Sequence, residues 1–133
     1  MLKYSGYLKE LGVKKSDFKP KRWLDSRYFN DKHSNIAEVE TWNLDYTLIM
    51  VLYSYLRRFK ECSKAIPARF TDEEWNKILD DMIKGFEDYI RWSYSEETKR
   101  DTCDEYFTER EQMMKGVEYS MWLLSKYLFD LSW

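Results

Sequence analysis

A helix-start signal from Phe70 to Trp75 constrains the fold more than any other feature of this sequence. The Thr71 hydroxyl can accept a hydrogen bond from the backbone N–H of Glu74, and the Glu74 carboxylate can reach back to the N–H of Thr71, as in a capping box. Phe70 and Trp75 hold the positions of a hydrophobic staple, so their rings are expected to pack together. Apolar residues then recur at spacings of three and four: Trp75, Ile78, Leu79, Met82, Ile83, Phe86 and Ile90. This pattern predicts an amphipathic helix that begins beside Thr71.

Turn-forming residues are scarce in the rest of the chain. The 133 residues include 4 Gly and 2 Pro, whereas 44% are hydrophobic and 18% are aromatic. Sandwiches and barrels need many turns, so this composition favours a few long helices, and it supplies enough apolar surface for a core. The length corresponds to one domain. We therefore predict a single all-α domain over residues 1–133, built as a small bundle of three main helices.

Two further helices are predicted around the first one. Thr41 is a candidate N-cap for a helix that ends before Pro67, because proline restricts the residue that precedes it. Its expected apolar face comprises Trp42, Leu44, Leu48, Val51, Leu52, Tyr55, Leu56 and Phe59. The last helix is expected from about Tyr106 to Leu131. It carries a heptad-like stripe, which we interpret as the face that joins the bundle: Val117, Met121, Leu124, Leu128 and Leu131.

Residues 1–40 are predicted to form a basic, aromatic N-terminal arm that carries short helices. Tyr4, Tyr7, Leu8 and Leu11 stand at helical spacing, and Gly12 can end that helix. Residues 1–32 hold nine Lys or Arg against four Asp or Glu, a balance of +5, while the remainder holds thirteen bases against twenty acids, or −7. We expect the arm to pack on the acidic helices of the chain itself. A nucleic-acid patch is the alternative interpretation.

The sequence lacks the patterns of most catalytic and metal sites. His33 is the sole histidine and stands in a polar loop context, so neither a catalytic triad nor a carboxylate–histidine metal site is expected. The acid pairs Glu73/Glu74, Asp80/Asp81 and Glu87/Asp88 are interpreted as a solvated helix face, with a partner-binding face left open. Paired-carboxylate hydrolysis is not excluded by composition, but no acid pair has an apolar setting. We expect no enzymatic activity, no cofactor and no metal.

Targeting and redox signals are also lacking. Cys62 and Cys103 are far apart and share no metal-type spacing, so a reduced cytoplasmic protein is expected. The N-terminus has no signal-peptide core, and the apolar stretch from Leu48 to Tyr53 is too short to span a bilayer. We therefore expect no membrane partner.

The aromatic residues exceed what three helices can bury. Six Trp, eleven Tyr and seven Phe predict either a ring-rich core with Tyr hydroxyls in water or an exposed patch of the kind found in interface hot spots. Asp45 either is favoured by a helix N-terminus or pairs with Arg27 or Arg69 to hold the arm. An incompletely buried aromatic face also favours a homo-oligomer, most simply a dimer. The candidate partner- or ligand-binding residues are Lys21, Arg22, Trp23, Arg27, Tyr28, Asp45, Arg57 and Arg58.

Three segments resemble a family of short, uncharacterised bacteriophage proteins. The pattern ETWxLDxT appears as Glu40-Thr41-Trp42-Asn43-Leu44-Asp45-Tyr46-Thr47, and LxRFKE as Leu56-Arg57-Arg58-Phe59-Lys60-Glu61. The pattern LTxEEWxxILDxMIxxFE is matched from Phe70 to Glu87, and the C-terminal helix matches loosely. The resemblance implies a phage or prophage origin and action in the host cytoplasm, and it supplies no catalytic residues.

These observations favour a non-enzymatic phage accessory protein that binds a host protein and inhibits, for example, a defence effector. The first alternative is a protein that binds or sequesters an anionic nucleotide through Arg, Lys and aromatic residues of the arm. The second alternative is a nucleic-acid-binding accessory protein, whose binding would weaken steeply with salt.

Overall fold

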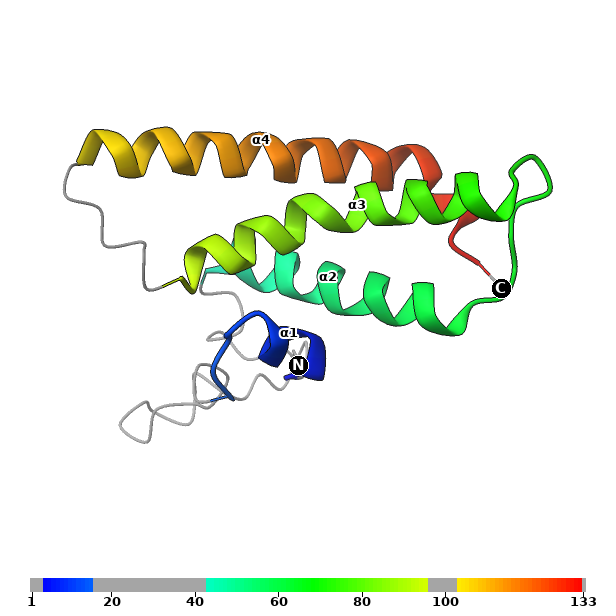
Figure 1. The fold of residues 1–133 in the computed structure, drawn as a ribbon, viewed down its shortest axis with the longest axis horizontal. Helices are drawn as coiled ribbons and strands as arrows, with labels where there is room; N and C mark the ends of the chain where they lie inside the picture. The colour runs from blue at the N-terminus through cyan, green and yellow to red at the C-terminus, as the bar shows by residue number, and fades with distance from the viewer. Residues whose placement is uncertain (1–3, 16–42, 96–102, 133) are drawn as a thin grey trace, which may run out of the picture.

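The described part of the chain consists of helices. The computed structural model describes residues 4–15, 43–95 and 103–132, and within these ranges it contains no strand. The elements are α1 (Gly6–Glu10), α2 (Leu44–Cys62), α3 (Asp72–Ser93), α4 (Cys103–Tyr127) and the 3₁₀ turn η5 (Leu128–Asp130). The long helix α3 lies between α2 and α4, and α1 packs beside α2 (Figure 1). The predicted all-α bundle with three main helices is confirmed.

The start of α3 is confirmed in most details. Thr71 is the N-cap, and its Oγ1 accepts from the N–H of Glu74 at 3.2 Å. The rings of Phe70 and Trp75 stack with centroids 5.8 Å apart, and the Tyr127 ring meets both edge-on. Among the described contacts, the Glu74 carboxylate does not return a bond to Thr71, so only half of the capping box forms. The staple therefore fixes the start of α3 and also ties it to α4.

Helix α2 begins later than predicted, and only part of its predicted apolar face is buried. It begins at Leu44 behind Asn43, which adopts a left-handed conformation (φ 50°) that asparagine tolerates, so Thr41 is not the N-cap. The buried residues of α2 are Met50, Tyr53 and Leu56. Three members of the predicted face instead remain exposed: Leu44, Leu48 and Tyr55. Apolar side chains occupy most of the helix circumference, so their spacing did not identify the inner face.

Helix α1 closes one flank of the core, as predicted for residues 4–12. Ser5 caps it by accepting from the N–H of Leu8 at 3.3 Å, and Gly12 follows it with φ 90°. Leu8 is fully buried in the main core, and the Ser5 hydroxyl lies 2.9 Å from that of Ser54 on α2. The expectations for the rest of the arm, residues 16–40, lie outside the described residues.

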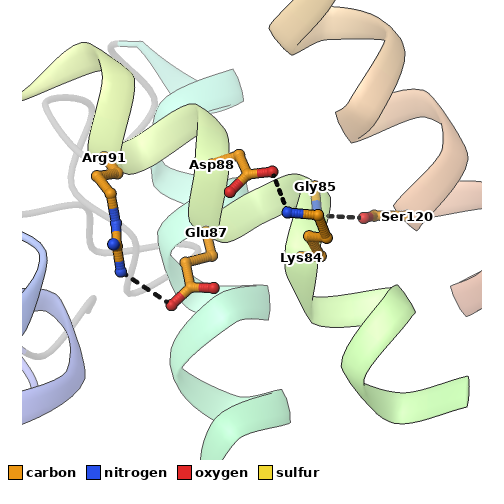
Figure 2. A network of polar contacts seen from close by, with 6 residues as sticks. All are labelled: Lys84, Gly85, Glu87, Asp88, Arg91 and Ser120. Atoms are coloured by element: carbon orange, nitrogen blue, oxygen red, sulfur yellow. Dashed lines mark hydrogen bonds and ion pairs between the residues drawn. The ribbon is translucent and has the colours of Figure 1, made fainter. Parts of the chain in front are cut away.

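Helices α3 and α4 cross at small residues. The N–H of Gly85 donates to the buried Ser120 hydroxyl at 2.9 Å (Figure 2). The Gly85 backbone also lies directly against that of Gly116. Near the other end of the contact, Trp92 Nε1 donates to a carboxylate oxygen of Glu109 at 3.0 Å. The contact therefore depends on two glycines and one serine, which allow a close approach of the two backbones.

The predicted apolar stripe is not the buried face of α4, because the helix turns its small residues toward α3. The buried residues of α4 are Ser120 and Leu123. Val117 and Leu124 are only half-buried at the edge of the core, while Met121 is 44% exposed and Leu128 50% exposed. The heptad-like stripe thus runs along the border of the interface with α3, and its outer half faces solvent.

Candidate functional site

The outer surface of α4 and η5 exposes more large apolar side chains than any other described element. Phe107 is 61% exposed, Trp122 55% and Phe129 93%. With them, seven large residues of these elements are at least 40% exposed: Phe107, Met114, Tyr119, Met121, Trp122, Leu128 and Phe129. Monomers rarely expose apolar patches of several hundred Å², and such patches mark binding surfaces. This surface is therefore the best candidate functional site in the described residues.

Four of these residues form what we call the outer seam: Phe107, Met114, Met121 and Leu128. They are seven residues apart, so they follow one line along α4 into η5. Two half-buried residues, Val117 and Leu124, border the seam on its inner side and contact the core. The seam is consequently continuous with the hydrophobic core.

A second group lies on another side of α4, toward its C-terminal end. The rings of Tyr119 and Trp122 stack with centroids 5.9 Å apart. The ammonium group of Lys126 lies 5.1 Å from the centroid of the Trp122 ring and 5.3 Å from that of Tyr127. A cation over a half-exposed indole is attractive by roughly 0.5–1 kcal/mol at such a site. These contacts hold the Trp122 ring in a defined position.

Three carboxylates accompany the outer seam, and we call them the acidic row: Asp104, Glu111 and Glu118. Each stands three residues before a member of the seam, so the row runs parallel to it on the solvent side. All three side chains are exposed, and among the described residues none of them forms an ion pair. The acidic row is therefore available to a cationic partner.

The outer face of α3 is different, because three of its cations pair with acids one turn away in the same helix. Lys77 contacts Asp81 at 3.2 Å. Figure 2 shows two more such pairs, Lys84–Asp88 at 3.0 Å and Arg91–Glu87 at 3.2 Å. The members of the three acid pairs are exposed or half-buried, as expected for a solvated helix face, and a partner-binding face stays an open alternative. Across the described residues, no three His, Cys, Asp or Glu side chains come together as metal ligands.

The predicted binding residues fall into two groups. Lys21, Arg22, Trp23, Arg27 and Tyr28 lie outside the described residues. The other three, Asp45, Arg57 and Arg58, all belong to α2.

Asp45 occupies the first turn of α2 and is exposed, as an acid favoured by the helix N-terminus would be. It does not pair with Arg69, which instead contacts Asp130 at 2.5 Å. The proposed pairing with Arg27 lies outside the described residues. Asp45 is separate from the outer surface of α4.

The two arginines serve mainly the contact between α1 and α2. Arg57 donates to the hydroxyl of Tyr53 at 2.9 Å, and its guanidinium lies 4.9 Å from the ring centroid of Tyr7. Arg58 is exposed and lies 3.5 Å from Glu61, which accepts from the Tyr7 hydroxyl. Arg57 and Arg58 therefore both lie near Tyr7, and the contacts given above join them to residues of this chain.

Three tyrosines in and beside the core have raised pKa values. Burial between α2 and α3 raises the pKa of Tyr46 to about 12, and its ring packs 5.5 Å from that of Tyr89. Burial also raises the pKa of Tyr53 and of Tyr89. These hydroxyls stay neutral at ordinary pH. Their arrangement is that of a ring-rich core and provides no general base.

Sequence reasoning missed the outer seam, although a signal was present. Phe107 and Met114 repeat at the same seven-residue interval as Met121 and Leu128, so the apolar repeat extends beyond the predicted stripe. Only the close contact at Gly85 shows that another side of α4 faces inward.

Comparisons with protein-family models, curated proteins and solved structures find no match to this chain. None of the described helices combines the length and apolarity that a membrane crossing requires. The fold and the exposed surface of α4 therefore carry the functional argument, and together they define a small helical domain with an apolar, acid-bordered face.

Proposed function

We propose that this chain acts by binding a protein through the outer surface of α4 and η5. The observation that carries the proposal is the set of seven large apolar side chains on these elements that are at least 40% exposed. Large side chains can bury about 150–250 Å² each, so their exposed parts offer roughly 700–800 Å² together. That area approaches the ~800 Å² that each partner contributes to a standard interface.

The composition of this surface supports a protein partner over the alternatives. It combines Phe, Tyr, Trp and Met with a cation at Lys126, which resembles the centre of many protein interfaces. Helix α4 carries five acids against three bases, so it would repel the phosphates of a nucleic acid or a nucleotide. The two alternative functions depend on the basic residues of the arm, and no contact in the described residues favours them.

The resemblance to short bacteriophage proteins supports a host protein as the partner. A small phage accessory protein that acts in the host cytoplasm would work by occupying a host factor, such as a defence effector. The outer surface of α4 is large enough for that purpose without catalytic groups.

The proposal is tested by capture from a bacterial lysate with matched surface variants. Met121→Glu places a charge in the exposed surface, whereas Lys77→Glu places one on the charge-paired face of α3. The wild type and Lys77→Glu should capture the same protein, and Met121→Glu should lose it. Equal capture by all three proteins would contradict the proposal.

A further inference from the structure

The outer seam and the acidic row together specify a kind of partner. We propose that the element that docks on α4 is an amphipathic helix with an apolar stripe and a Lys/Arg-rich flank. This inference rests on the proposed function and names the structural class and charge of the partner segment.

The spacing of the outer seam favours a helix over other partner elements. Phe107, Met114, Met121 and Leu128 repeat every seven residues, which is the repeat that two packed helices share. Val117 and Leu124 stand between them on the inner side and are half-buried, so the apolar positions there alternate at spacings of three and four, as they do along packed helices. Four seam residues span about 30 Å of helix, which corresponds to a docked segment of roughly 20 residues.

The acidic row determines the charge of the docked helix. Asp104, Glu111 and Glu118 occupy the flanking position beside the seam, where residues of a partner helix come within reach. Their carboxylates have no cation of their own among the described residues. Each exposed pair changes affinity by roughly 1.5- to 5-fold, so three pairs together change it by roughly 3- to 100-fold.

The same charges disfavour a second copy of α4 as the occupant. In an antiparallel pair of identical helices, like flanks face each other, so the acidic row would meet its own copy. In a parallel pair, the acidic row of one helix would face the other flank of the outer seam on the second helix. That flank contains Ser120 and Tyr127, which pack against α3 and its staple. Self-association through α4 is therefore opposed in either orientation.

Synthetic helices of known composition test the inference. Three helical peptides of about 21 residues share one leucine stripe and carry Lys, Gln or Glu at the flanking positions. Their affinities for the full chain are measured by fluorescence anisotropy at low and high salt. The Lys peptide should bind about tenfold or more tightly than the Glu peptide, and the difference should shrink as salt rises.

Variants of the acidic row provide the matched test. Glu111→Lys/Glu118→Lys should reverse the preference so that the Glu peptide binds more tightly. Glu73→Lys, an exposed reversal in the first turn of α3, should leave the preference of the wild type unchanged. Met121→Glu should weaken the binding of all three peptides, because it removes an apolar contact that all of them share.

Each contrary result has a distinct meaning. If no peptide binds, or if the Lys, Gln and Glu peptides bind with equal affinity, the inference is overturned. If Met121→Glu nonetheless abolishes capture of a protein from lysate, the proposed function stands and its partner uses another structure. A concentration-dependent dimer in analytical ultracentrifugation that Met121→Glu dissolves would identify a second copy as the occupant and would also overturn the inference.

Discussion

One added methyl group at Gly85 should separate α3 from α4. A Cβ at this position would lie 2.0 Å from the carbonyl oxygen of Gly116, 2.2 Å from Ser120 Oγ and 2.6 Å from the carbonyl carbon of Gly116. Two of these three atoms belong to the main chain, which cannot rotate away as a side chain can. Gly85→Ala therefore forces the two helices apart along their whole contact.

The expected cost combines three terms. Overpacking at a main-chain contact destabilises by about 3 kcal/mol, the upper end of the usual range. Loss of the hydrogen bond from the Gly85 N–H to Ser120 adds about 1 kcal/mol, and the better helix propensity of alanine returns about 1 kcal/mol. The free energy of unfolding should fall by about 3 kcal/mol, which corresponds to a Tm lower by roughly 10 °C.

Gly116→Ala is the matched control, because it adds the same methyl group on the other side of the contact. Its Cβ would meet only Cα of Gly85 at 3.7 Å, an ordinary contact. Only the better helix propensity of alanine then affects stability, so this variant should be stabilised by up to about 1 kcal/mol. Urea unfolding followed by circular dichroism measures both variants. Equal effects of the two substitutions would refute the asymmetric packing on which the reasoning depends.

Three further changes test the hydrogen bonds and the ionisation of the core. Ser120→Ala removes the acceptor of the Gly85 N–H and should cost about 1 kcal/mol in urea unfolding. Thr71→Ala removes the cap on the N–H of Glu74 and should also cost about 1 kcal/mol, whereas Thr71→Ser should restore it. Burial raises the pKa of Tyr46 to about 12, while an unfolded tyrosine ionises near 10. The contribution of Tyr46 to the free energy of unfolding should therefore be constant below about pH 10 and fall toward pH 12, and Tyr46→Phe should make the decline of stability between these pH values less steep.

The start of α3 could be predicted from the sequence because its determinants are local. Thr71 caps an N–H three residues away, and Phe70 and Trp75 pack across five positions. Each contact follows from backbone geometry at the beginning of a helix and needs no knowledge of the neighbouring helices. The short helix α1 was predictable for the same reason, since Ser5 and Gly12 mark its two ends.

The inner faces of α2 and α4 could not be predicted in this way. Both helices carry apolar residues around most of their circumference, so periodicity leaves more than one face that could turn inward. Tertiary contacts decide the choice: Tyr53 of α2 turns inward and Tyr55 outward, while Ser120 of α4 turns inward and Met121 outward. The sequence therefore points to candidate binding residues in the arm and on α2, whereas the largest group of exposed apolar side chains in the described residues lies on α4.

The small residues at the α3–α4 contact connect the fold to the proposed function. Gly116 and Ser120 bring the backbones together, so α4 is held by close approach and one buried hydrogen bond. Its large residues, such as Met121 and Trp122, take little part in that contact and stay exposed. Stability and the proposed recognition thus involve different sides of one helix. Substitution of Met121 should consequently change binding while leaving the unfolding transition near that of the wild type, which allows binding and folding effects to be separated experimentally.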